Sequence, residues 1–168
     1  MDMYSVGEYI MKPANGVCEI KDIVDREFLD TKKQYYQLVP LCDRNAVLYV
    51  PVNRTEDSIR SVMTSKEAEA LIKMIPEIEE SWVNNEKERE RRYKEAIRSN
   101  DPVKLVGVIK LIYQRKKTRQ EQGKKTTVVD GRYFDMAEKL LYSELEFAMK
   151  KSKDEVKNLI REHCETIE

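Results

Sequence analysis

The sequence predicts an α+β protein with two domains, an N-terminal β domain followed by a helical bundle. Over residues 1–62, short runs of alternating apolar and polar residues are separated by turn-forming residues, a pattern typical of strands. After Ser65 the apolar residues recur at helical spacing instead. A chain of 168 residues has room for one large domain or two small ones. We therefore expect a β domain over residues 1–62, a connecting helix or linker over 63–75, and a helical domain over 76–168.

The β domain is predicted from four short alternating segments. They cover residues 9–11, 17–20, 35–39 and 46–50. Turn-forming residues stand between them, at 13–16, 29–31 and 43–45. Four or five short strands this close together predict a small barrel or a strongly bent sheet.

The first helices are predicted from a change of period and from capping residues. Ser65 is expected to cap a helix that carries Glu67 in its first turn. Pro76 ends this helix and can open the next one, over the charged stretch 76–99. Four residues of that stretch share one helical stripe, and they are Ile78, Trp82, Tyr93 and Ile97.

Three further helices follow in the same way. The run Asn100-Asp101-Pro102 predicts a helix stop and a new start. Residues 103–113 are apolar nearly all round, which indicates a buried helix, and its end runs into the cationic residues 114–119. Thr127 and Ser152, each followed three residues later by an acidic residue, are expected to open the last two helices.

The charges of the chain are unevenly distributed. Overall, 31 Lys and Arg residues balance 31 Asp and Glu residues. Residues 87–125, however, carry 14 basic and 5 acidic residues, whereas residues 126–168 carry 7 and 10. A basic block between acidic flanks predicts a polyanion partner for that block alone. The alternative is a solvated helix face laced with ion pairs.

Within the basic block, two helix segments and a loop carry the cations that a phosphate backbone would meet. These cations are Arg89, Arg91, Arg92, Lys94, Arg115, Lys116, Lys117, Arg119, Lys124 and Lys125. Trp82, the only tryptophan, lies in a polar stretch close to them. An apolar wedge beside basic residues is one way in which proteins enter minor-groove base steps. Alternatively, Trp82 packs onto the bundle through the stripe that it shares with Tyr93.

Catalysis and cofactor binding are not indicated. His163 is the only histidine, and the three cysteines have no metal-ligand spacing. The five glycines form no phosphate-binding loop. The chain has no apolar run of 18 residues and begins without a basic, then apolar, leader. We therefore expect a cytoplasmic, non-enzymatic binding protein with no metal and no cofactor.

The chain resembles the CarD/CdnL family of bacterial transcription regulators, whose N-terminal module is shared with the transcription-repair coupling factor. Residues 6–20, VGEYIMKPANGVCEI, match the start of that module. Further matches follow in order along almost the whole chain. They are residues 35–38, 50–52 and 59–60, then Trp82, and then residues 91–94, 99–101, 111–117 and 137–145.

This resemblance implies a function for each domain. The β domain would be a Tudor-like module that docks on the β subunit of RNA polymerase by edge-strand addition. Arg26, Tyr49, Val50 and Pro51 fall at positions expected to make that contact. The helical domain would bind promoter DNA at the upstream edge of the −10 element, where the family tryptophan wedges into the minor groove and stabilises the open complex.

One departure from the family pattern concerns this wedge. In well-known members the tryptophan directly precedes an Arg-Arg-Tyr run, whereas eight residues separate Trp82 from Arg91 here. An insertion of about seven residues is close to two helical turns, so the facing of the side chain can be kept. A second interpretation stays open: a polymerase-bound adaptor whose helical domain binds another protein rather than DNA.

Overall fold

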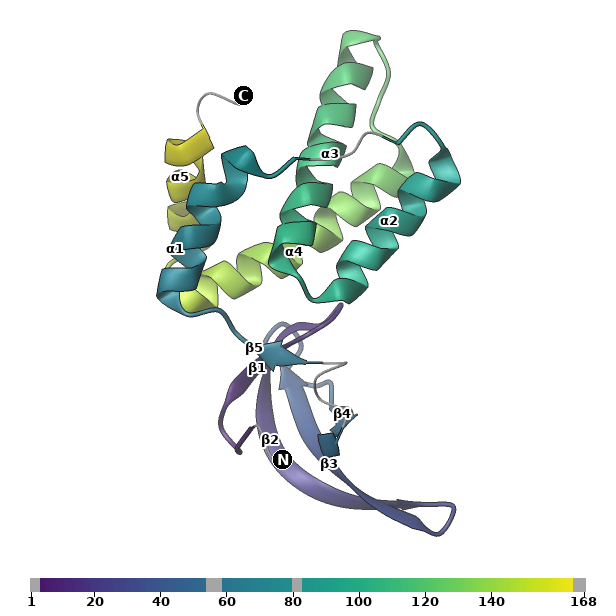
Figure 1. Cartoon of the computed structure of the whole chain (residues 1–168), viewed down its shortest axis with the longest axis vertical. Helices are drawn as coiled ribbons and strands as arrows, with labels where there is room; N and C mark the ends of the chain where they lie inside the picture. Colours follow the sequence, from purple (N-terminus) through teal and green to yellow (C-terminus); the bar gives the residue numbers. More distant parts are fainter. Residues whose placement is uncertain (1–3, 54–58, 80–82, 165–168) are drawn as a thin grey trace. The chain divides into compact units, whose positions relative to one another are not determined.

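The structure is a computed structural model that describes residues 4–53, 59–79 and 83–164. The chain divides after Val62 into two compact units, which we call the β unit and the helical unit. Their strands and helices are labelled in Figure 1. The α+β fold class predicted from the sequence is confirmed. Within the described residues, no helix is long and apolar enough to span a membrane.

The β unit is one antiparallel sheet of five strands. They are β1 (Tyr9–Lys12), β2 (Gly16–Phe28), β3 (Thr31–Pro40), β4 (Leu48–Pro51) and β5 (Arg60–Ser61). The strands lie in the order β4-β3-β2-β1-β5, so β4 and β5 form the two edges. The ladder between β2 and β3 shifts register between Ile20 and Asp22. Such a bulge bends a strand and increases its twist.

The core of the β unit lies on one face of this sheet. Its largest side chain is Tyr36, which is fully buried. The Tyr4 ring meets it edge to face at 6.0 Å between centroids, and the Tyr36 hydroxyl accepts a hydrogen bond from the Tyr4 amide. The other buried members are Ile10, Cys18, Ile20, Leu38, Val50 and Ile59. Because β4 contributes Val50 to this core, packing fixes the position of that edge strand.

The β2–β3 hairpin is much longer than the sequence predicted. Strands were expected over 17–20 and 35–39, but the ladder continues outward until Phe28 pairs with Thr31. The prediction stopped short because the outer residues are mostly charged and lack the apolar alternation by which strands are detected. Leu29 and Asp30 form the two-residue turn that closes the hairpin.

The helical unit contains five α-helices and one 3₁₀ turn in its described residues. They are α1 (Ser65–Met74), η2 (Ile75–Glu77), α2 (Glu86–Ser99), α3 (Pro102–Glu121), α4 (Val128–Met149) and α5 (Lys153–Cys164). The predicted caps Thr127 and Ser152 each accept a backbone hydrogen bond as expected. Asp101, in the predicted stop and new start at 100–102, caps α3 by accepting the Val103 amide. The cap of α1, however, is Thr64 rather than Ser65, and it forms a reciprocal capping box with Glu67.

A single helix over residues 76–99 was also predicted, and this is wrong. Pro76 lies in η2, the chain is extended at Ile78, and α2 begins only at Glu86. The Asn85 side chain caps α2 by accepting the Glu88 amide. This strong local cap outweighs the weak apolar stripe that suggested a continuous helix.

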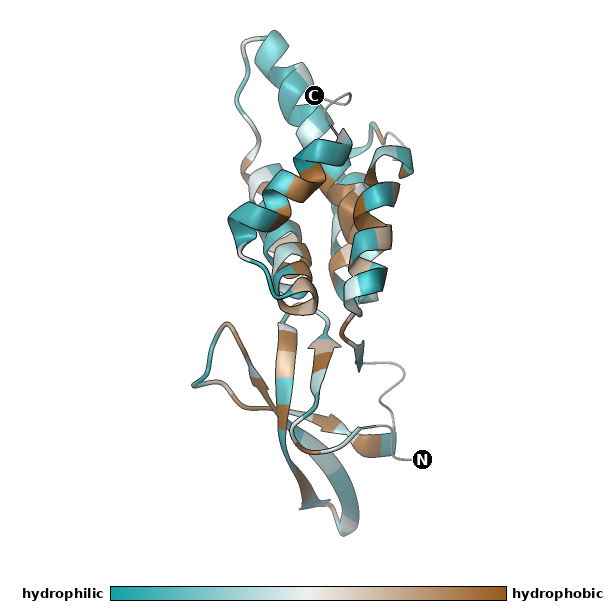
Figure 2. Cartoon of the chain, turned by 90° about the vertical axis from the view of Figure 1, so that its left-hand side faces the viewer, coloured by the Kyte–Doolittle hydropathy of each residue, from teal (hydrophilic) through white to brown (hydrophobic). Residues whose placement is uncertain are grey.

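Two apolar clusters hold the helices together, and both involve α3 and α4. One joins α1, η2 and α5 to these helices around Ile72, Val106 and Leu145. The other joins α2 to them around Tyr93 and Ile112. Figure 2 shows the apolar residues concentrated where the helices face one another, with hydrophilic outer faces. The segment 63–75, expected as a connecting helix or linker, includes helix α1, whose buried residues pack into the first of these clusters.

Candidate interaction surfaces

One side of α2 carries a row of exposed cations. Arg91, Lys94 and Arg98 follow one another at spacings of three and four residues, so they share one face of the helix. Together with Glu95, Ser99 and Lys104 they line an open cleft of about 620 Å³. We call these six residues the α2–α3 surface; four of them are cations, namely Arg91, Lys94, Arg98 and Lys104.

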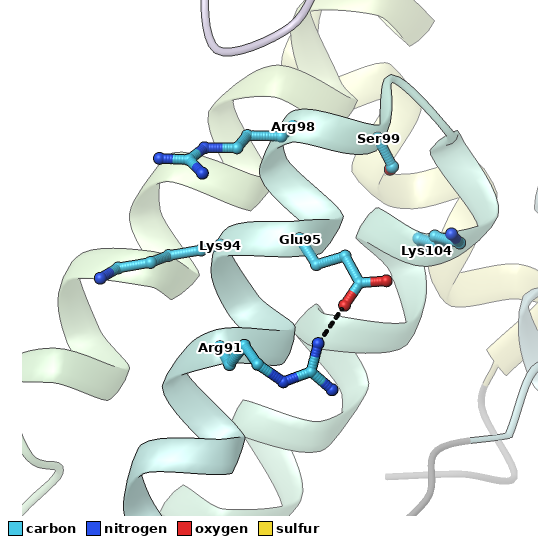
Figure 3. Close-up of a pocket in the computed structure, with 6 residues that line it drawn as sticks. All are labelled: Arg91, Lys94, Glu95, Arg98, Ser99 and Lys104. Carbon is cyan, nitrogen blue, oxygen red and sulfur yellow. Dashed lines mark hydrogen bonds and ion pairs between the residues drawn. The ribbon is translucent and has the colours of Figure 1, made fainter.

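The α2–α3 surface is broad rather than enclosed. Figure 3 shows Lys94 and Arg98 extending to one side of α2, while Lys104 lies on the other side, on α3. The ion pair of Arg91 with Glu95, 2.9 Å long, lies between them. Four cations against one carboxylate give a net positive charge without a closed cavity. This arrangement suits an extended polyanion better than a small ligand, because small-ligand pockets are concave and mostly apolar.

Acidic neighbours on α2 hold these cations extended. The Arg91 Nε donates to Glu88 at 2.9 Å, Arg92 lies 3.7 Å from Glu88, and Lys94 lies 3.6 Å from Glu90. The hydrogen bond from Arg91 lowers the pKa of the Glu88 carboxyl, which keeps it ionised. Exposed ion pairs of this kind contribute little stability, so a phosphate can replace the carboxylates at little cost.

Arg89 does not belong to this exposed row. Its side chain is buried, and its Nη1 donates to the carbonyl oxygens of Val83 at 3.0 Å and Asn84 at 3.5 Å. On α3, Lys110 donates in the same way to the carbonyls of Ile75, at 2.8 Å, and Ile78. Two cations therefore fix the backbone on either side of the segment that contains Trp82.

The predicted wedge, Trp82, lies outside the described residues. What the structure does describe is the anchoring of its flanks. Ile78 and Val83 are both buried, with 9% of each residue exposed. Ile78 and Val83 are five positions apart in the sequence, and the four residues Glu79 to Trp82 lie between these two buried positions.

Arg115 also points inward. Its Nε donates to Asp130 at 2.9 Å, and the Tyr93 hydroxyl donates to the other oxygen of the same carboxylate at 2.8 Å. The Arg115 and Asp130 side chains are 11% and 3% exposed. Burial, and then the hydrogen bond to Asp130, raise the pKa of the Tyr93 phenol well above its ordinary value. These three residues connect α2, α3 and α4 and do not offer a free charge to a partner.

The remaining cations of the basic block lie at the C-terminal end of α3 and in the loop that follows. Lys116, Lys117, Lys124 and Lys125 are exposed. Among the described residues, none of these four side chains has an ion-pair partner within 4 Å. Arg119 is half-buried and donates to the Lys125 carbonyl at 2.7 Å, which holds the loop against the helix end. We call the four lysines the α3 tip.

The sequence reasoning missed two members of the α2–α3 surface, Arg98 and Lys104. For Arg98 the signal was available, since it continues the spacing of Arg91 and Lys94 by one further turn. For Lys104 the linear sequence carries no such signal. It joins α2 only because the chain reverses at Asn100, which adopts a left-handed conformation, and at the cap Asp101.

Two of the four residues expected at the polymerase contact form a pair in the β unit. The Arg26 Nη2 donates to the Tyr49 hydroxyl at 2.7 Å, and the guanidinium carbon lies 4.6 Å from the centre of the Tyr49 ring. Both side chains are exposed. Val50, by contrast, is buried, so it can meet a partner only through its backbone. Pro51 is half-buried and ends β4.

Comparison with known protein families gives two matches that together cover most of the chain. The CarD-like/TRCF RID domain matches residues 4–63, which correspond to the sheet. The CarD C-terminal domain matches residues 70–161, which correspond to the helices. The second match alone spans more than half of the 168 residues. No curated protein matches the chain.

Proposed function

Because the chain belongs to the CarD-like family of transcription-associated, RNA polymerase-interacting proteins, we propose that it binds polymerase and promoter DNA at once and stabilises the open complex. The observation that carries the DNA part is the α2–α3 surface. Its cations are exposed and unenclosed, whereas Arg89, Lys110 and Arg115 are turned inward to support the fold. The described cations thus divide into a structural set and a set available to phosphates.

We assign the phosphate contacts to the exposed set. Within the predicted residues it comprises Arg91, Arg92, Lys94, Lys116, Lys117, Lys124 and Lys125. Arg98 and Lys104 are added to it by their place on the α2–α3 surface. Arg89, Arg115 and Arg119 become positioning residues, because backbone carbonyls or a buried carboxylate occupy their guanidinium groups. Phosphate contacts of this kind supply affinity and orientation without reading sequence.

Trp82 is the proposed wedge at the edge of the melted bubble. Its anchored flanks support this role, since an inserted side chain must be held against the force of restacking bases. Lys110 and Arg89 fix the backbone before and after it. Stabilisation then follows from linkage: a protein that binds the open complex more tightly than the closed one shifts the population towards the open state, without catalysis.

The β unit is the proposed polymerase-binding module, and its target is the β subunit. β4 is an edge strand, and edge strands recruit partners by strand addition. The exposed Arg26–Tyr49 pair stands beside this edge, because Tyr49 belongs to β4. An arginine stacked on an aromatic ring combines two residue types that are enriched at the centres of interfaces.

The salt dependence of DNA binding tests the proposal with the full chain. We would measure its affinity for a forked duplex that imitates the upstream edge of the −10 element, between 50 and 200 mM salt. If about five of the nine assigned cations contact phosphates at one time, the slope of log K against log salt is about −4.5, which is about a 500-fold loss over that range. An affinity that barely changes with salt, or no affinity, would favour the adaptor, whose helical unit binds protein instead.

Paired variants locate the contacts. Lys116→Gln with Lys117→Gln removes two charges of the α3 tip and should reduce the slope by about 1.8. Lys66→Gln with Lys73→Gln removes two exposed charges from α1 and serves as the matched control. If the two double variants change the slope equally, net charge rather than the α3 tip is responsible.

A further inference from the structure

The outer half of the β2–β3 hairpin is not paired with the other described strands of the sheet. β1 pairs with β2 only as far as Glu19, and β4 pairs with β3 only from Tyr35 onward. The ten residues 25–34 therefore form a two-stranded ribbon that no other described strand covers. Figure 1 shows this ribbon extending beyond the other strands of the sheet. Two-stranded ribbons are at best marginally stable in water.

The described side chains of this ribbon belong to no buried cluster. All nine side chains described within residues 25–34 are exposed. Across the strands, Glu27 faces Lys32, a favourable pair, but Arg26 faces Lys33. The second pair is tolerated because the Arg26 guanidinium turns towards Tyr49 instead. The nine described side chains of the ribbon are thus exposed rather than packed in a core, which is unexpected for a segment with only a structural role.

The turn at the tip of the ribbon is also unusual. Leu29 and Asp30 both have positive φ angles, of 49° and 64°. A two-residue hairpin turn of this kind strongly prefers Asn-Gly, because a bulky side chain is strained in the left-handed conformation. Yet position 29 is a leucine whose surface is 99% exposed. Backbone strain and full exposure of an apolar side chain both oppose its presence, and such unfavourable features concentrate at functional sites.

We infer that Leu29 is an apolar anchor that inserts into a hydrophobic pocket on RNA polymerase when the β unit docks. This inference rests on the proposed docking through β4, since the same hairpin carries Arg26 at its base. The tip extends about 15 Å beyond the last pair with β4, at about 3.3 Å per residue, so a large partner seated on that edge can reach it. The ribbon carries three acidic and three basic residues, so it offers no net attraction to phosphate.

A variant that improves the turn while removing the anchor tests this inference. Leu29→Asn with Asp30→Gly supplies the residues that the turn prefers. We expect it to raise the melting temperature of the full chain by a few degrees and to weaken its affinity for core polymerase about tenfold or more. Val6→Asn is the control, because Val6 is another exposed apolar residue of the β unit, 56% exposed. It should leave the polymerase affinity unchanged.

Each alternative gives its own result. If the turn variant binds polymerase as tightly as wild type while Arg26→Ala binds weakly, docking stands and the Leu29 anchor is wrong. If wild type itself does not bind polymerase, the proposed docking fails together with the anchor. If sedimentation shows that the wild type is a dimer and the turn variant a monomer, the tip contacts a second copy of the chain, and the inference is overturned.

Discussion

The Tyr93 hydroxyl donates a 2.8 Å hydrogen bond to the buried carboxylate of Asp130, although the two residues are 37 positions apart in the chain. The same carboxylate accepts Arg115 at 2.9 Å, and the Asp130 amide donates to the cap residue Thr127. One acidic side chain therefore connects three helices while its own backbone starts the last of them. Asp130 thus joins the same three helices, α2, α3 and α4, that share one of the two apolar clusters.

Removal of this carboxylate should be strongly destabilising. Asp130→Ala leaves a buried phenol and a largely buried guanidinium without their shared acceptor, so we expect a loss of about 3 kcal/mol. Urea unfolding followed by circular dichroism measures the loss. Lys116→Ala, which alters the exposed neighbour of Arg115, is the control and should stay within about 0.5 kcal/mol of wild type. Equal effects of the two substitutions would contradict the structural role of this network.

The anchoring of the Trp82 segment can be followed by its own fluorescence, since the chain has one tryptophan. Lys110→Met removes the donor to the Ile75 and Ile78 carbonyls. We expect about 1–3 kcal/mol of lost stability and a lower fluorescence anisotropy of Trp82 in the folded protein. Lys104→Met, an exposed cation on the same helix, should change neither quantity. An unaltered anisotropy in Lys110→Met would show that this lysine does not position the segment.

Arg26 should matter for polymerase binding and little for folding. Arg26→Ala removes the hydrogen bond to Tyr49 and the stacked cation, both at exposed positions. We expect the affinity for core polymerase to fall about tenfold, with unchanged thermal stability. Arg44, which pairs with Glu19 at 3.0 Å, is a second exposed arginine of the β unit and supplies the control Arg44→Ala. If both substitutions reduce affinity alike, general charge rather than the Arg26–Tyr49 pair is responsible.

Cys18 is expected to make the β unit less stable at alkaline pH. Burial raises the pKa of its thiol from 9.0 to about 11. The unfolded chain therefore releases this proton at lower pH than the folded chain does. The contribution of the thiol to the free energy of unfolding is complete below pH 9 and is lost as the pH rises from about 9 to about 11, which amounts to about 3 kcal/mol.

Comparison with a variant isolates this contribution from the other groups that titrate in the same range. Cys18→Val keeps an apolar residue in the core and lacks the thiol. Urea unfolding between pH 8 and pH 11 should show a steeper decline for wild type than for Cys18→Val. Parallel declines would mean that the thiol is not responsible.

Local signals in the sequence were sufficient for the boundaries of several helices. Thr127 and Ser152 were predicted as caps and act as caps, because a cap depends on residues within one turn of it. The start of α3 follows the run 100–102, as predicted. The same reasoning misplaced the start of α1 by one residue and extended α2 backwards through Ile78. In the second case Pro76 was interpreted as the first residue of the next helix, and a weak apolar periodicity was followed past the cap Asn85.

The orientation of charged side chains could not be predicted in this way. Arg89 and Arg91 are two residues apart on one helix, yet one is buried and the other exposed. Arg89 turns inward because it donates to the carbonyl of Val83. Arg115 turns inward because it donates to the distant carboxylate of Asp130. Such partners are brought together by tertiary packing, so a basic block in the sequence marks a candidate surface without identifying which of its cations are available.

The lifetime of the promoter open complex, with the matching polymerase, tests the central claim most directly. It should be measured without the protein, with wild type and with Trp82→Ala. We predict that wild type lengthens the lifetime and that Trp82→Ala loses most of this effect while it still folds and still binds polymerase. A wild type without effect, or a folded Trp82→Ala variant that matches wild type, would contradict the account and favour the adaptor.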